Sequence, residues 1–234
     1  MGFEQRYHDA DAYMADTGTW HEEDAAWKAE HLLGALRGAG WTPGRVADVG
    51  CGTGGVLAHL APRMPGAELH GFEIAEPAYR IAKARETERL RFHHRSLLDE
   101  AGAPYDLVLA MDVFEHVPDY LGFLGALRPH GAAFAFHIPL DLSVRTVWQR
   151  GMSAKRTRVG HLHFFTADTA RDALRDTGYR VVAERFTHAI VQPAPAGLKA
   201  KLRTAHHRAL FGMSPEMCAR VLGGCSLMVL ATPE

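Results

Sequence analysis

The sequence contains little cysteine, little net charge and no long apolar run. Only three of its 234 residues are cysteines (Cys51, Cys218 and Cys225), too few and too scattered for a disulfide framework or a CxxC zinc site. Lys and Arg (26) nearly balance Asp and Glu (27), and the net charge of −1 argues against bulk-charge binding to nucleic acids or membranes. No apolar run reaches the ~18 residues of a membrane span.

The composition and the first residues indicate where the protein works. Apolar residues make up 47% and charged residues 23%, the balance of an ordinary globular domain with a substantial core. The opening stretch, MGFEQRYHDADAYMAD, lacks the basic start and apolar run of a signal peptide. We therefore expect a cytoplasmic protein with reduced thiols and no membrane partner.

Strand-like and helix-like segments alternate along most of the chain. After a roughly helical stretch at 21–37, strands are predicted at 45–49, 68–73, 89–94, 105–112, 132–140, 180–186 and 225–231. Helices are predicted at 56–61, 76–86, 120–129, 166–179 and 197–210. This alternation predicts a parallel sheet with helices on both faces, which binds ligands beyond the carboxyl ends of its strands.

A glycine-rich loop and an acid mark the first two of these strand ends. The run from Asp48 to Gly55, DVGCGTGG, joins the first strand to the first helix, and glycines there allow a nucleotide to approach the backbone. Glu73 ends the second strand, where a carboxylate can accept both ribose hydroxyls. Asp48 would repel a pyrophosphate but would suit a cofactor with an ammonium and a sulfonium.

These and later segments together resemble the class I S-adenosylmethionine-dependent methyltransferases of the small-molecule type. The resemblance covers residues 40–234 through VADVGCGTGG, HGFEIAEPAYRIAKAR, PYDLVLAMDVFEHVPD, GHLHFFTADTARDALRDTGYRVV and the closing strand. It implies an α/β Rossmann-like three-layer sandwich, with a seven-stranded, mostly parallel sheet whose last strand is antiparallel. It also implies a cofactor domain over 41–234 with an insertion at 141–165, and a helical cover over 1–40.

The resemblance assigns the S-adenosylmethionine contacts residue by residue. Asp48 would face the ammonium, Glu73 would hold the ribose hydroxyls and Ile74 would pack on the adenine. Ser96 and Leu97 stand where the family often has an adenine-binding Asp, and Met111 would lie beside the methionine end. The loop beneath the methionine would consist of Gly50, Cys51, Gly52 and Gly54, with the Cys51 side chain serving only to pack.

The segment DVFEHV supplies the predicted catalytic group. His116 is placed to act as a general base on an acceptor hydroxyl or amine, although it could instead only hydrogen-bond nearby backbone. The pattern DxxEH is also similar to the ExxEH of ubiquinone-pathway O-methyltransferases, where it holds a divalent ion. Asp112, Glu115 and His116, completed by His161 or His163, could form such a site, but EHV also occurs in family members without metal, and we expect none.

The acceptor contacts are predicted from the N-terminal segment and the insertion. Tyr7, Tyr13 and Trp20 would line the cover, and His161 and Arg145 would face the acceptor. The favoured function is methyl transfer to a small molecule at oxygen, in secondary or cofactor metabolism. The alternatives are an RNA or protein methyltransferase that docks through basic stretches at 141–165 and 197–210, and a non-catalytic nucleoside-binding partner protein.

Overall fold

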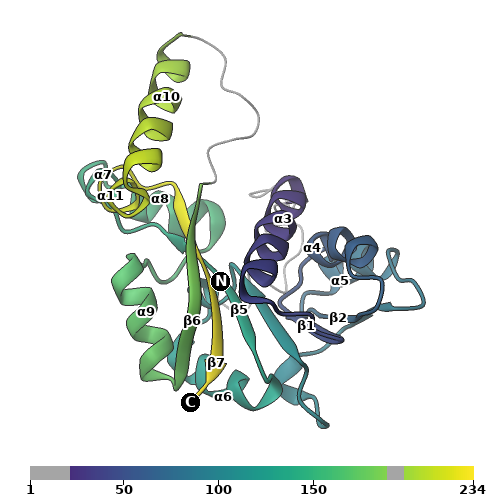
Figure 1. Cartoon of the computed structure of the whole chain (residues 1–234). Coiled ribbons are helices and arrows are strands. Elements are labelled where there is room, and N and C mark those ends of the chain that lie inside the picture. The colour runs from purple at the N-terminus through teal and green to yellow at the C-terminus, as the bar shows by residue number, and fades with distance from the viewer. Residues whose placement is uncertain (1–21, 189–197) are drawn as a thin grey trace.

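The computed structural model describes residues 22–188 and 198–234, which form one seven-stranded sheet flanked by helices (Figure 1). The strand order is β3-β2-β1-β4-β5-β7-β6. All neighbouring strands are parallel except β7, which runs antiparallel to both β5 and β6. The strands are β1 (Arg45–Val49), β2 (Glu68–Phe72), β3 (Leu90–His93), β4 (Leu107–Met111), β5 (Phe134–Leu140), β6 (Tyr179–His188) and β7 (Cys225–Pro233). The predicted sheet, with its antiparallel last strand, is confirmed.

Helices cover both faces of the sheet and make three layers. Leu32, Leu57 and Ala82 share one buried cluster, which places α3 (Glu22–Ala39), α4 (Gly55–Leu60) and α5 (Glu76–Lys83) on one face. Leu124 and Leu174 belong to the other cluster, with α6 (Tyr120–Leu127) and α9 (Ala167–Asp176). The remaining helices are α7 (Val144–Trp148), α8 (Gly151–Val159), α10 (Leu198–Met213) and α11 (Pro215–Val221).

The central strands are apolar because both of their faces are buried. In β4, Leu107 and Leu109 pack toward α3 and α4, whereas Val108 and Ala110 pack toward α6 and α9. Alternate strand residues point to opposite faces, so a strand covered on both sides needs an unbroken apolar run. That run is the signal by which the sequence predicted β4.

The strand order reverses between β1 and β4, and this reversal fixes where a ligand can bind. The chain proceeds outward through β2 and β3 on one side of β1, and through β4 and β5 on the other. The crossovers at that point leave in opposite directions and open a crevice at the carboxyl ends of the strands. The glycine loop, Glu73 and the DVFEHV segment all follow strands that end there.

The insertion at 141–165 contains the short helices α7 and α8. One element differs from the sequence-based prediction: α11 lies between the predicted last helix and β7. The α11 helix is only seven residues long, too short for a clear periodic pattern, and begins where the Ser214 hydroxyl accepts from the Met217 N–H. Among the described helices, none combines the length and apolarity needed to cross a bilayer.

Candidate active site

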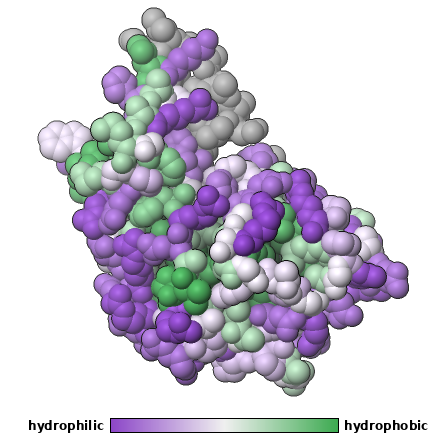
Figure 2. Space-filling view, in the orientation of Figure 1, coloured by the Kyte–Doolittle hydropathy of each residue, from purple (hydrophilic) through white to green (hydrophobic). Residues whose placement is uncertain are grey.

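A cavity of about 690 Å³ opens at the carboxyl edge of the sheet. Its walls come from the segments that follow β1 to β5, closed by α3, α8 and the start of β7. Hydrophilic side chains dominate the visible face of the molecule, and apolar side chains show between them toward its middle (Figure 2). Most of the residues that the sequence analysis singled out line this one cavity.

The glycine loop lies at one end of the cavity. Gly50 and Gly52 have φ angles of +64° and +56°, which side-chain-bearing residues rarely adopt. The N–H groups of Gly50 and Cys51 donate to the Phe72 carbonyl at 2.8 and 3.1 Å, which fixes the loop against β2. A Cβ atom added to Gly52 would meet nothing within 4 Å, so this part of the loop leaves room for a ligand.

Gly54 serves packing rather than the cavity. Its φ is +77°, and an added Cβ atom would lie 2.4 Å from the Phe92 ring. It is buried and does not line the cavity. Its role is to let α4 begin close to β3.

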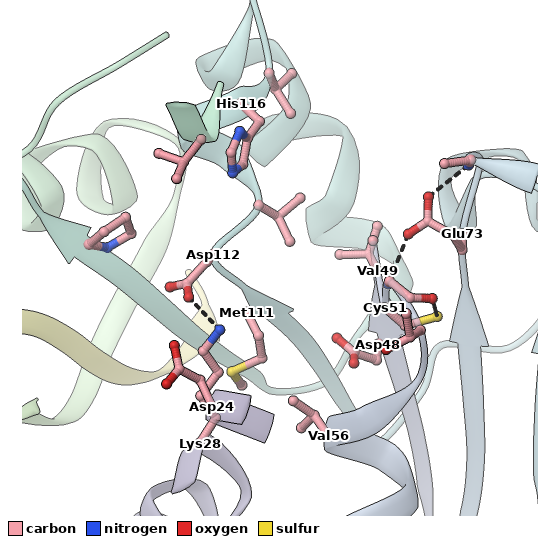
Figure 3. A pocket seen from close by; sticks show the side chains of 18 of the residues that line it. Asp24, Lys28, Asp48, Val49, Cys51, Val56, Glu73, Met111, Asp112 and His116 are labelled. Carbon is pink, nitrogen blue, oxygen red and sulfur yellow. Dashed lines mark hydrogen bonds and ion pairs between the residues drawn. The ribbon is translucent and has the colours of Figure 1, made fainter. Parts of the chain in front are cut away.

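Glu73 is buried beside the glycine loop (Figure 3). Its Oε2 accepts from the Gly52 N–H at 2.9 Å and its Oε1 accepts from the Ala75 N–H at 2.7 Å. Burial raises the pKa of Glu73, and the backbone N–H groups oppose that effect. Each oxygen keeps further lone pairs, so this fixed carboxylate can still accept hydroxyl groups from the cavity.

Asp48 is the least satisfied acid in the cavity wall. It is 1% exposed, and its Oδ1 has no hydrogen-bond partner. Burial raises the pKa of Asp48 to about 8, an effect that Lys28 opposes and Glu73 increases. A buried carboxyl without a partner is unfavourable unless a ligand supplies one. A cationic group bound at this end would do so, and the residues therefore fit the ammonium of S-adenosylmethionine.

The other predicted cofactor residues divide into two groups. Ile74, Cys51, Ser96 and Met111 line the cavity, with Ile74 54% exposed. Leu97 is fully buried and does not line it; the neighbouring Leu98 does. The reason is that a 3₁₀ turn begins at 97, with the Ser96 hydroxyl accepting from the Leu98 N–H at 3.1 Å.

The opposite end of the cavity is built around Asp112. This residue has a φ of +58°, and its Oδ2 lies 2.7 Å from Lys28 Nζ. Its Oδ1 lies 2.5 Å from His137 Nδ1, and His137 Nε2 lies 3.0 Å from the Thr187 hydroxyl. Burial would raise the pKa of Asp112, but His137 and Lys28 outweigh it and hold the pKa well below its usual range.

Lys28 is the main functional residue that the sequence analysis missed. It is 8% exposed on α3; burial lowers the pKa of Lys28, but the nearby acids, Asp112 foremost, outweigh burial and raise the pKa. Nothing local distinguishes this lysine from others on an amphipathic helix, because its partner is 84 positions away in the sequence. Figure 3 shows the pair facing the cavity opposite Glu73.

His116 lines the cavity in the turn after β4. Its Nδ1 lies 3.2 Å from the Gly160 carbonyl, which can only accept, so Nδ1 carries a proton, and its Nε2 lies 3.9 Å from Glu115 Oε1. The neighbouring Glu115 is fully buried, and neither of its carboxyl oxygens has a hydrogen-bond partner. Burial and the nearby Asp112 charge raise the pKa of Glu115 well above its usual range.

The insertion contributes His161 through an ion-pair cluster. His161 Nδ1 lies 2.6 Å from Asp141 Oδ2, and Lys155 pairs with the other oxygen. Burial would raise the pKa of Asp141, but His161 and Lys155 outweigh it and lower the pKa. Asp141, Lys155 and His161 all line the cavity.

One predicted acceptor contact does not lie in this wall, and three fall outside the described residues. Arg145 is on α7 and does not line the cavity; Lys155 on α8 is the insertion residue that does. Tyr7, Tyr13 and Trp20 lie outside the described residues.

The metal-ligand grouping differs from the DxxEH pattern. Donor atoms of Glu115, His116 and His161 lie within 4.8 Å of one another, whereas Asp112 is engaged by Lys28 and His137. The short Asp side chain and its positive φ direct it toward α3 instead. The expectation of a site without metal stays a prediction.

Comparisons with known proteins agree with this geometry. A family model described as a methyltransferase domain matches residues 19–184. A ubiquinone biosynthesis O-methyltransferase from Ruegeria pomeroyi (strain ATCC 700808 / DSM 15171 / DSS-3) is 40% identical over 152 residues, 59% of this chain and 60% of that protein. The namesake from Bordetella avium (strain 197N) is 34% identical over 122 residues, 47% of this chain and 50% of that protein. The match thus spans about half the length of these relatives.

Solved structures extend the likeness to the whole fold. The magnesium protoporphyrin IX methyltransferase of Synechocystis PCC 6803, crystallised with S-adenosylhomocysteine, superposes with a TM-score of 0.59 at 16% identity. The superposition covers 99% of this chain and 93% of that one. The fold, the glycine loop and a family match over most of the sequence together show that the chain belongs to the methyltransferase-domain family, within the class I S-adenosylmethionine-dependent methyltransferases.

Proposed function

We propose that this chain transfers a methyl group from S-adenosylmethionine to a hydroxyl of a small molecule. The observation that carries the proposal is the pair of buried acids at one end of the cavity. Asp48 has an oxygen without a partner, and Glu73 is held in place by two backbone N–H groups. Two acids in those states suit a ligand with a cationic end and a diol.

The cofactor end would bind S-adenosylmethionine through fixed groups. Glu73 accepts the ribose hydroxyls, and Asp48 ionises when it faces the ammonium. Ile74, exposed in the wall, offers an apolar surface to the adenine ring. When bound, S-adenosylmethionine supplies an electrophilic methyl group on a sulfonium.

The acceptor end combines an apolar wall with two lysines, Lys28 and Lys155, each paired with an acid. The apolar lining residues around His116 are Val113, Val117, Pro118, Phe123, Pro139 and Val159. Lys155 adds a positive charge at this end, although Asp141 shares it. Such a wall suits an acceptor with an apolar or aromatic body and an acidic hydroxyl. The cavity must hold both reactants in about 690 Å³, which favours a small acceptor.

His116 would accept the proton of the acceptor hydroxyl. The Gly160 carbonyl accepts from Nδ1–H, and we assign Nε2 as the ring atom that takes the proton. Removal of the proton raises the nucleophilicity of the oxygen, while the walls align it with the methyl group. The names of the related O-methyltransferases support oxygen as the target atom.

Calorimetry with S-adenosylhomocysteine tests the cofactor end. The wild-type chain should bind it, and Glu73→Ala should weaken binding by about 100-fold, because charged hydrogen bonds to the ribose are lost. Glu76→Ala is the matched control, since Glu76 is an exposed acid paired only with Arg80. A wild-type chain that binds no S-adenosylhomocysteine would overturn the proposal.

A panel of acceptors tests the other end. Phenols, catechols, aliphatic alcohols, carboxylic acids and a short RNA are each incubated with S-adenosylmethionine, and S-adenosylhomocysteine release is measured. We expect release with a phenolic acceptor and none with RNA. Turnover restricted to RNA or to a protein substrate would contradict the small-molecule assignment.

A further inference from the structure

A second cluster of chemically active side chains lies outside the functions assigned so far. His188 ends β6, His207 lies on α10, Cys218 on α11, and Cys225 begins β7. All four side chains are buried, with exposed fractions of 9%, 2%, 0% and 3%. Four elements thus direct two imidazoles and two thiols to one interior point.

The distances among three members of the cluster match those between the ligands of a tetrahedral metal. Cys218 Sγ lies 3.4 Å from His207 Nδ1, and one ligand atom each from His207, Cys218 and Cys225 lie within 4.8 Å of one another. Zinc bonds of about 2.0–2.3 Å set roughly 3.3–3.8 Å between the ligand atoms of a tetrahedron. His188 Nε2 is in direct contact with His207 Nδ1, closer than two ligands of one ion lie, so His188 is a neighbour of this group and not a member of it.

The orientation of His207 is that of a metal ligand. Its Nε2 lies 2.6 Å from the Gly223 carbonyl, which can only accept, so Nε2 carries the proton. Nδ1 then carries the lone pair, which the His188 ring contacts, and Cys218 Sγ lies 3.4 Å from Nδ1 and 3.6 Å from Nε2. Metal-bound histidines commonly donate their other N–H to a backbone carbonyl, which fixes the ring and its tautomer.

We propose that His207, Cys218 and Cys225 bind one Zn²⁺ ion, with His207 Nδ1 exchanging its contact with His188 for the metal. Two sulfurs and one imidazole nitrogen favour zinc among common ions. Each thiol releases its proton to solvent as the metal binds, and the two thiolates neutralise the charge of the ion. The fourth zinc position is left for a water molecule beside His188.

Such an ion would attach the α10–α11 pair to the sheet. Both helices lie in the connection between β6 and β7, and Figure 1 shows α10 extending away from the body of the sheet. Cys225 and its neighbours Gly224 and Ser226 also line the cavity wall. The zinc would therefore fix one edge of the cavity. This inference does not depend on the identity of the methyl acceptor.

Metal content after reconstitution tests the proposal. The reduced chain, prepared without an affinity tag, is loaded with Zn²⁺, freed of excess ion and measured by mass spectrometry. We expect about one tightly held zinc per chain in the wild type and a loss of most of it in Cys218→Ser. His206→Ala is the matched control, since this exposed neighbour contacts only the Leu202 carbonyl among its recorded hydrogen bonds, and it should keep the ion.

Cobalt substitution gives a readout that needs no variant. Co²⁺ bound by the wild type should show the intense visible absorption of a tetrahedral site and a sulfur-to-metal charge-transfer band. Zinc should also raise the melting temperature of the wild type but not that of Cys218→Ser, because binding to the folded state alone stabilises it.

A third variant separates this cluster from the one near the active site. His161→Ala should keep its zinc, because His161 belongs to the group with Glu115 and His116. Zinc lost in His161→Ala but retained in Cys218→Ser would overturn the proposal. So would a reduced wild type without tightly bound metal, or a Cys218–Cys225 disulfide that resists mild reduction.

Discussion

The two ends of the cavity are built in different ways. At the cofactor end, the loop at 50–55 and Glu73 follow adjacent parallel strands, and backbone N–H groups fix the carboxylate. At the acceptor end, Asp112 is fixed by Lys28 from α3 and His137 from β5, which are distant in the sequence. The cofactor end is held by backbone hydrogen bonds between adjacent strand ends, whereas the acceptor end is held by a network of side chains from distant parts of the sequence.

Because of this difference, substitutions at the two ends should have different effects. At the cofactor end, one carboxyl oxygen of Asp48 has no hydrogen-bond partner in the free protein. A ligand that supplies this partner gains binding free energy there. The acceptor end pairs Asp112 and Asp141 internally, so its charges serve the structure before any acceptor arrives. Variants at the acceptor end should therefore damage stability, and variants at the cofactor end should damage binding.

Lys28→Ala should give the largest effect and should act on stability. Removing Lys28 leaves the ionised Asp112 with only His137 as a partner, and breaking a buried ion pair costs about 3 kcal/mol of the free energy of unfolding. Urea denaturation measures it. Lys83→Ala, which removes an exposed pair with Glu86, should cause no measurable change. Similar stabilities for the two variants would remove the distinction between the ends.

His116→Ala should lower turnover without lowering cofactor affinity. Loss of a general base reduces kcat by about 100-fold for a hydroxyl acceptor. An acceptor already ionised at neutral pH should lose much less, because no proton must be removed. Single-turnover rates and S-adenosylhomocysteine calorimetry measure the two effects. Equal losses with both acceptors would assign His116 to positioning alone.

Asp48→Asn should weaken S-adenosylhomocysteine binding by about 10-fold and remove its pH dependence. The pKa of Asp48 near 8 means that the free protein holds a proton that must leave when the ammonium binds. Wild-type affinity should therefore rise about 20-fold from about pH 6 to about pH 7.5. Calorimetry across that range checks the sign, and a wild-type affinity independent of pH would contradict the assigned partner.

Glu115→Gln should have the smallest effect on activity, within about twofold. The raised pKa favours the neutral form of Glu115, and an amide replaces a neutral acid with little change. Because the folded pKa lies above the unfolded value, the contribution of Glu115 to stability is greatest in acid and falls as pH rises; the variant lacks this fall. Its advantage in melting temperature should grow from about pH 5 to about pH 8. Collapse of methyl transfer would instead indicate a divalent ion on Glu115.

The sequence predicted the strands and the cofactor end because their signals are local. An apolar run buried on both faces, such as 107–111, and a loop with forced positive φ at Gly50 and Gly52 depend on neighbours along the chain. Leu97 and Gly54 were placed in the site by resemblance, and the structure shows both packed in the interior instead. Side-chain direction within a turn does not follow from residue type.

The acceptor end and the Cys–His cluster could not be predicted in the same way. Lys28 and Asp112 meet only because α3 packs across the crevice, and no periodicity marks that contact. The spacing of Cys218 and Cys225 was read as excluding a CxxC zinc site, yet the turn before β7 returns them to one point beside His207.

The sequence by itself determined the sheet, its strand ends and the acids that follow them, since each rests on a pattern within a few residues. Only the tertiary structure decided which charges are paired, which carboxyls stay neutral and which thiols face imidazoles. The physical reason is that burial and partner distance set those states, and both depend on how separate elements pack rather than on the identity of any one residue.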